Sequence, residues 1–177
     1  MMMMNGNRKI TVLVFLVLVA LGVATGFAQQ AQADSASGME LSEADRAAVF
    51  KAAGAARKKD MWVICADDPN PSGATIETVR DLNGDGRPEA VVTEGGMFCY
   101  GHAGTGFQVL SKQADGRWRR MTGGSGIPEF MKTRGAGGWP DISVGGPGFC
   151  FPVERWNGKS YELHRFEYQG KRCKPQR

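Results

Sequence analysis

The chain has 177 residues, with 22 Lys and Arg against 18 Asp and Glu, 25 glycines and 42% hydrophobic residues. This length has room for one domain with a hydrophobic core, and the ordinary content of charged and hydrophobic residues excludes wholesale disorder. The glycines show no collagen-like period, so they indicate many tight turns rather than a fibre.

Residues 1–33 have the pattern of a secretory signal peptide. Two basic residues at 8–9 precede an almost unbroken apolar run over 10–23, and an A-x-A site follows at 31–33. A basic start, an apolar stretch of this length and a small-residue cleavage site are typical of such a peptide. The run is short for a membrane span, although an uncleaved anchor is the alternative. We therefore expect cleavage after residue 33, a linker over 34–40 and no stable membrane span in the mature chain.

Cleavage changes the charge balance of the chain. It removes two basic residues and no acidic one, which leaves 20 basic and 18 acidic residues and a net charge of +2. Nucleic-acid binders normally concentrate more positive charge than this, so we expect no nucleic-acid partner. The export signal instead predicts a periplasmic or secreted protein, and an envelope protein or a glycan as its partner.

One helix followed by strands is predicted for residues 41–177, which we expect to form a single exported α+β domain. Ser42, followed by Glu43 and Asp45, is a helix-start signature, and the alanine-rich stretch after it predicts an amphipathic helix over 43–59. Short apolar or alternating segments predict strands at 61–65, 75–80, 89–93, 107–112, 117–121, 149–156 and 160–166. The Gly-rich residues 122–140 are predicted to form a long ordered loop.

Two hairpin turns and a weak internal repeat connect the strands. Asp115-Gly116 and Asn157-Gly158 are strong hairpin signals. The pattern P-[ED], strand, GG, FC, hairpin occurs twice, beginning at Pro88 and at Pro140. Two copies suggest two blade-like β units but are too few for a closed propeller, and chance similarity of Gly-rich strands is the alternative. The predicted fold is α+β, with one N-terminal helix packed on antiparallel β-hairpins in a disulfide-bonded domain.

The segment from Asp81 to Glu89 reads D-x-N-x-D-G-x-x-E. Alternating Asp81, Asn83 and Asp85 place side-chain oxygens on the inside of a tight curl, and the glycine at the sixth position allows the sharp turn. Three carboxylates and an amide oxygen suit Ca²⁺ far better than zinc. An EF-hand loop would need a glutamate at its twelfth position, where this chain has Val92.

The loop resembles the calcium loops of FG-GAP (VCBS-like, integrin-type) repeats, in which such a loop joins two antiparallel strands. The resemblance covers about residues 75–94. It implies that Ca²⁺ binds as a structural ion, with ligand roles for Asp81, Asn83, Asp85, the carbonyl of Arg87, and Glu89. Asp is commoner than Glu at the last of these positions. The same composition also suits a plain Asp/Asn/Gly turn without a metal, which is the alternative.

Four cysteines in an exported chain favour two disulfides, for which three pairings exist. The expected strand directions bring Cys99 beside Cys65 and return Cys173 towards Cys150, which favours Cys65–Cys99 and Cys150–Cys173. The matching GG and FC contexts support a rival arrangement, Cys99–Cys150 with Cys65–Cys173. Cys99 also forms a C-x-x-H pair with His102, but an oxidising compartment favours a disulfide over a catalytic or zinc-binding thiol.

Catalytic motifs are sparse, since no G-x-S-x-G, H-E-x-x-H or P-loop pattern occurs. The sequence therefore favours a calcium-stabilised binding module without catalytic activity, with an inhibitor or immunity protein as a special case. The alternative is an envelope hydrolase acting on glycan or peptidoglycan through a carboxylate pair, drawn from Glu94, Glu129, Asp141 and Glu154. Trp139, in a Gly-rich loop, is predicted as an exposed contact for a glycan or protein, with a buried loop anchor as the alternative.

Overall fold

The computed structural model describes residues 39–175. The predicted signal peptide, residues 1–33, lies outside the described residues, as does most of the 34–40 linker. Within the described part, none of the helices has both the length and the apolar character needed to cross a bilayer.

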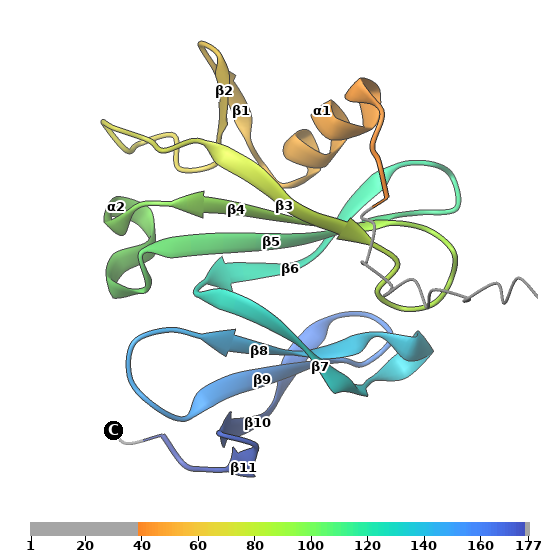
Figure 1. Cartoon of the computed structure of the whole chain (residues 1–177), viewed down its shortest axis with the longest axis vertical. Coiled ribbons are helices and arrows are strands. Elements are labelled where there is room, and N and C mark those ends of the chain that lie inside the picture. The colour runs from red at the N-terminus through yellow and green to blue at the C-terminus, as the bar shows by residue number, and fades with distance from the viewer. Residues whose placement is uncertain (1–38, 176–177) are drawn as a thin grey trace, which may run out of the picture. The chain divides into compact units, whose positions relative to one another are not determined.

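Antiparallel strands are the main secondary structure of the described chain and make up nearly half of it (Figure 1). The first sheet has the order β3 (Ala74–Arg80), β4 (Glu89–Gly95), β5 (Thr105–Lys112) and β6 (Trp118–Ser125). The second sheet has the order β11 (Lys171–Arg172), β10 (Tyr161–Tyr168), β9 (Phe151–Trp156), β8 (Pro140–Gly145) and β7 (Ile127–Arg134). A separate hairpin pairs β1 (Ala56–Lys58) with β2 (Met61–Val63). The helical elements are α1 (Glu43–Ala52), α2 (Met97–Tyr100) and the 3₁₀ turns η1 (Gly101–Ala103) and η2 (Ala136–Gly138).

Helix α1 is shorter than the sequence predicts. Ser42 caps its start, because the Ser42 hydroxyl accepts the N–H of Asp45 at 3.1 Å. The helix ends at Ala52, and Gly54 then takes the left-handed conformation, with φ of 84°, that commonly ends helices. Residues 56–58 pair with β2 instead of continuing the helix. The predicted N-terminal helix over 43–59 is therefore not supported, since α1 lies at 43–52.

The prediction of a long loop over residues 122–140 is also wrong. β6 continues to Ser125, β7 follows at 127–134, and β8 begins at Pro140. Glycine suits this part of β6 because the side chain of Gln108 occupies the space that a Cβ at Gly123 would need. The chain passes from the first sheet to the second at Gly126.

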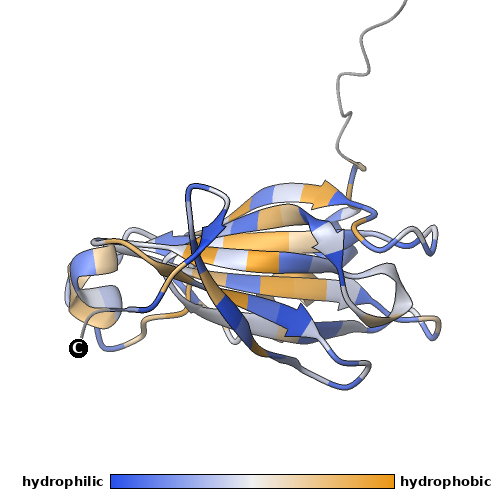
Figure 2. Cartoon of the chain, turned by 90° about the horizontal axis from the view of Figure 1, so that it is seen from below, coloured by the Kyte–Doolittle hydropathy of each residue, from blue (hydrophilic) through white to orange (hydrophobic). Residues whose placement is uncertain are grey.

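Two hydrophobic clusters cover the two faces of the first sheet. On one face, Phe50 of α1 packs in a cluster with Val92, Leu110 and other buried residues. On the other face, Phe107 and Val109 of β5 lie in a cluster with Ile142 of β8. The strongest hydrophobic colouring in Figure 2 accordingly lies along the strands. The first sheet is therefore the middle layer, between α1 on one side and the second sheet on the other (Figure 1).

The two favoured disulfides are confirmed. Cys65 pairs with Cys99, with Cα atoms 6.1 Å apart, and Cys150 pairs with Cys173, with Cα atoms 5.7 Å apart. The first disulfide ties the segment after β2 to α2, and the second ties the start of β9 to the residue after β11. The rival pairing is excluded, and the Cys99 thiol is not available for C-x-x-H chemistry.

Candidate functional site

The segment between β3 and β4 is a tight curl built around Asp81. The Asp81 carboxylate accepts the N–H groups of Gly84 at 2.7 Å, Asp85 at 3.2 Å and Gly86 at 2.8 Å. Gly84 and Gly86 have φ angles of 83° and 81°, which glycine adopts without strain. Burial alone would raise the pKa of Asp81, but the N–H donors outweigh burial and lower that pKa.

The side chains of Asn83 and Asp85 close the curl. The Asn83 side-chain oxygen accepts the N–H of Asp85, and its amide nitrogen donates to Asp85 Oδ2, both at 3.0 Å. Arg87 donates its N–H to Asp85 Oδ1 at 2.9 Å and pairs its guanidinium with Asp85 Oδ2 at 2.5 Å. The predicted residues Asp81, Asn83 and Asp85 therefore lie together in one hydrogen-bonded loop.

Glu89 lies beneath this loop, and none of its surface is exposed. One carboxylate oxygen accepts the N–H of Leu82, and the other accepts the hydroxyl of Ser111, both at 2.8 Å. Burial raises the pKa of Glu89, and the negative charges of Asp85 and Asp81 act in the same direction. Glu89 thus anchors the loop to β4 and β5, and its charge is repelled by those of Asp85 and Asp81.

The donor set of the loop matches the chemistry of Ca²⁺, which prefers carboxylate and carbonyl oxygens. Within residues 39–175, no group of three or more His, Cys, Asp or Glu is arranged to hold a metal. Both Glu89 oxygens accept hydrogen bonds, from Leu82 and Ser111. Each Glu89 oxygen retains a second lone pair for a cation. The residues that would hold the ion are those of the sequence prediction: Asp81, Asn83, Asp85, the carbonyl of Arg87, and Glu89.

Arg134, at the end of β7, connects this loop to the second sheet. Its guanidinium donates to the carbonyl of Leu82 at 2.9 Å and also to the carbonyl of Gly138. Gly138, with φ of 77°, lies so close to the carbonyl of Asn83 that a Cβ would not fit. Sequence reasoning missed Arg134. No motif along the chain pointed to it, because its contact with Leu82 spans 52 positions of the sequence.

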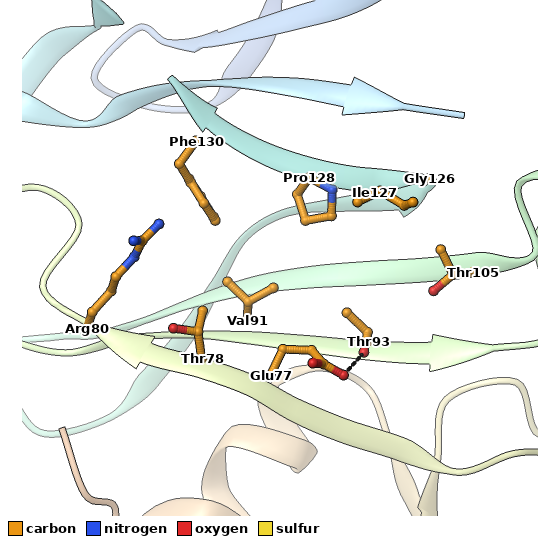
Figure 3. Close-up of a pocket in the computed structure, with 10 residues that line it drawn as sticks. All are labelled: Glu77, Thr78, Arg80, Val91, Thr93, Thr105, Gly126, Ile127, Pro128 and Phe130. Carbon is orange, nitrogen blue, oxygen red and sulfur yellow. Dashed lines mark hydrogen bonds between the residues drawn. The ribbon is translucent and has the colours of Figure 1, made fainter. Parts of the chain in front are cut away.

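A groove with a volume of about 510 Å³ lies between the face of the first sheet and strand β7 (Figure 3). One side is formed by residues of β3, β4 and β5: Glu77, Thr78, Arg80, Val91, Thr93 and Thr105. The other side is formed by Gly126 and by Ile127, Pro128 and Phe130 of β7. The groove thus combines an apolar wall with a floor of hydroxyl groups and two opposite charges.

The four carboxylates of the hydrolase alternative are not brought together. Glu94 accepts the N–H groups of Ile64 and Cys65 and the hydroxyl of Tyr100, at 2.9, 2.7 and 2.6 Å. In the second sheet, Glu154 pairs with Ile142, the neighbour of Asp141, so Glu154 and Asp141 point to opposite faces. Glu129 is exposed on β7.

Trp139 is buried, with only 7% of its surface exposed. Its ring centroid lies 5.9 Å from that of Trp156 and 6.3 Å from that of Tyr161. This aromatic cluster fixes the segment between β7 and β8. The predicted exposed contact at Trp139 is not supported, and the alternative of a buried loop anchor describes the residue.

Comparisons with family models, with curated proteins and with solved structures find no match for this chain. The function of the chain is therefore inferred from the geometry of the loop and the groove.

Proposed function

We propose that this chain is an exported, calcium-stabilised binding module that holds an envelope protein in the groove between its two sheets. The observation that carries this proposal is the position of the 81–89 loop. The loop joins β3 to β4, which both line the groove, and Arg134 connects the loop to β7, which forms the opposite wall.

The charge of the loop supports a cation. Asp81, Asp85 and Glu89 place three carboxylates within one short segment, and like charges in close proximity repel one another. Arg87 pairs with Asp85, but it leaves the buried Glu89 without a cationic partner among the described ion pairs. A bound Ca²⁺ would neutralise this charge and hold the two walls of the groove at a constant separation.

The two disulfides support export. Disulfides persist in the periplasm and outside the cell and are rare in the cytosol. One disulfide of this chain links the segment after β2 to α2, and the other links the residue before β9 to the residue after β11.

Calorimetric titration with Ca²⁺ and thermal unfolding in EDTA or in Ca²⁺ test the ion. Ca²⁺ at 100 times its dissociation constant should stabilise the fold by about 2.7 kcal/mol, which raises Tm by roughly 5 to 10 °C. Asp85→Ala should abolish most of this gain. Asp115→Ala is the matched control, since it also removes an aspartate that precedes a glycine in a turn. Identical melting curves for the natural protein in both buffers would contradict the proposal.

Capture from envelope extract tests the groove. Immobilised protein in Ca²⁺ should retain a partner that is lost in EDTA and lost with Ile127→Asp, which places a charge on the apolar wall. Leu163→Asp is the matched control, because Leu163 is a similarly exposed apolar residue on β10 that does not line the groove. Equal retention by the natural protein and the Ile127 variant would exclude the groove as the binding site.

A further inference from the structure

Strand β7 has a free edge that borders the groove. Within the described residues β7 pairs only with β8, at the end of the second sheet. Gly126, directly before β7, donates its N–H away from β8, to the carbonyl of Thr105 at 2.9 Å. Backbone groups of alternate residues in a strand point to the same side. The main-chain groups of Pro128 and Phe130 therefore also point away from β8.

Proline at position 128 agrees with this alternation, because proline has no N–H and occurs in strands where no ladder bond is needed. The backbone hydrogen bonds that the described residues form outside helices and strands do not use the N–H or carbonyl of Phe130. Phe130 therefore offers both its N–H and its carbonyl for pairing with another strand, next to the groove. A backbone edge of this kind is a template for an added strand.

The groove carries one cation that lacks a carboxylate partner. Arg80 is exposed at the end of β3, and its guanidinium lies 5.3 Å from the centre of the Phe130 ring. None of the ion pairs within residues 39–175 includes Arg80. Figure 3 shows Arg80 and Phe130 at the same end of the groove. A carboxylate at this end would therefore meet both a charge and a backbone donor.

The rest of the groove restricts what else its occupant can carry. Ile127 is 62% exposed on the wall and offers apolar surface to a partner side chain. Glu77 is exposed on the floor, where it accepts the hydroxyl of Thr93 at 2.8 Å. A second acidic residue of the occupant would be repelled by Glu77. The surface thus fits an apolar segment with a single acidic residue.

We propose that the groove binds an extended peptide segment of a partner protein, which adds as a strand to the edge of β7 and pairs an aspartate or glutamate side chain with Arg80. This inference rests on the proposed function and names the chemistry of the partner. Strand addition supplies affinity through main-chain hydrogen bonds, whereas side-chain pockets supply specificity. The carboxylate at Arg80 sets the register of the added strand.

Synthetic peptides test this inference on the full protein in Ca²⁺. The first is an octapeptide of alternating valine and threonine, blocked at both ends, with one central aspartate. The second has asparagine in place of aspartate, and the third is the asparagine peptide with a free C-terminal carboxylate. The first should bind about fivefold more tightly than the second, as expected for one exposed ion pair of about 1 kcal/mol. It should also slow hydrogen exchange of the Phe130 amide.

Arg80→Gln should abolish the preference for the aspartate peptide. Arg57→Gln is the matched control, because Arg57 also lies over an aromatic ring, 5.6 Å from the centre of Trp62, outside the groove. Equal affinity of the first two peptides for the natural protein, or binding without protection of the Phe130 amide, would overturn the inference. Preference for the third peptide alone would also overturn it, in favour of a terminal carboxylate. Envelope capture that depends on Ile127 but persists when the peptides fail would leave the proposed function standing.

Discussion

Glu89 in β4 and Asp141 in β8 are fully buried carboxylates that each follow a proline beginning one half of the internal repeat. Glu89 meets only neutral donors, and burial raises its pKa. Burial also acts to raise the pKa of Asp141, but hydrogen bonds from Arg155, Thr133 and Arg165 hold it well below its usual range. At equivalent positions of the repeat, a buried carboxylate therefore has a raised pKa in one half and a lowered pKa in the other.

Asp141 should make the protein sensitive to acid. Its pKa is lower in the folded state than the value of about 3.9 in an unfolded chain, so its stabilising contribution is complete above that value. The contribution is lost as the pH falls through the folded-state pKa. We expect Asp141→Asn to flatten the fall in the free energy of unfolding below pH 4, measured by urea unfolding. At pH 7 it should cost about 1.5–3 kcal/mol, because Arg155 and Arg165 each lose a charged hydrogen-bond partner, although Arg165 keeps its ion pair with Glu167.

Two further variants make this prediction decisive. Thr133→Val removes the 2.6 Å hydrogen bond to Asp141 and should lower the free energy of unfolding by about 1–2 kcal/mol. If the Asp141→Asn variant does not fold, the pH dependence of this milder variant tests the same prediction. Asp60→Asn removes an exposed aspartate that takes part in none of the ion pairs within residues 39–175 and should leave the acid limb unchanged. An acid limb of the same slope in the Asp141 variant and the natural protein would contradict the assignment.

Each disulfide should contribute to stability by restricting the unfolded chain. The sequence separations of 34 residues for Cys65–Cys99 and 23 for Cys150–Cys173 correspond to about 3–4 kcal/mol each. We expect paired Cys→Ser variants to lower the free energy of unfolding by this amount, measured in denaturant. Peptide mapping of the natural protein without reductant should recover the two cross-linked pairs, and free thiol at Cys99 or Cys150 would contradict them.

Trp139 should stabilise the fold through the packing of its buried ring. Trp139→Ala removes a ring that is 7% exposed, so it should cost about 3–5 kcal/mol. Phe98→Ala is the matched control, because Phe98 is an aromatic residue that is 64% exposed and its loss should change stability by about 0.5 kcal/mol or less. Thermal and urea unfolding measure both. Equal effects of the two variants would mean that the aromatic cluster around Trp139 does not stabilise the fold.

Short-range signals in the sequence were sufficient for the features that depend on neighbouring residues. Ser42 caps α1 as its spacing from Asp45 predicts, and Asn157-Gly158 forms the turn between β9 and β10. The curl of the 81–89 loop likewise follows from contacts within a few residues of Asp81. Strand direction, which each turn reverses, favoured the disulfide pairing that the structure has, but the matching GG and FC contexts left a rival pairing open.

Tertiary structure alone decided the end of α1, the strands within 122–140 and the burial of Trp139. The segment after α1 becomes a strand because β2 offers it a pairing partner, and Gly123 enters β6 because Gln108 fills the space above it. Arg134 reaches the carbonyl of Leu82 across 52 positions of the chain. These outcomes depend on which surfaces meet once the two sheets pack, and a periodicity or motif read along the chain carries no information about contacts of that separation.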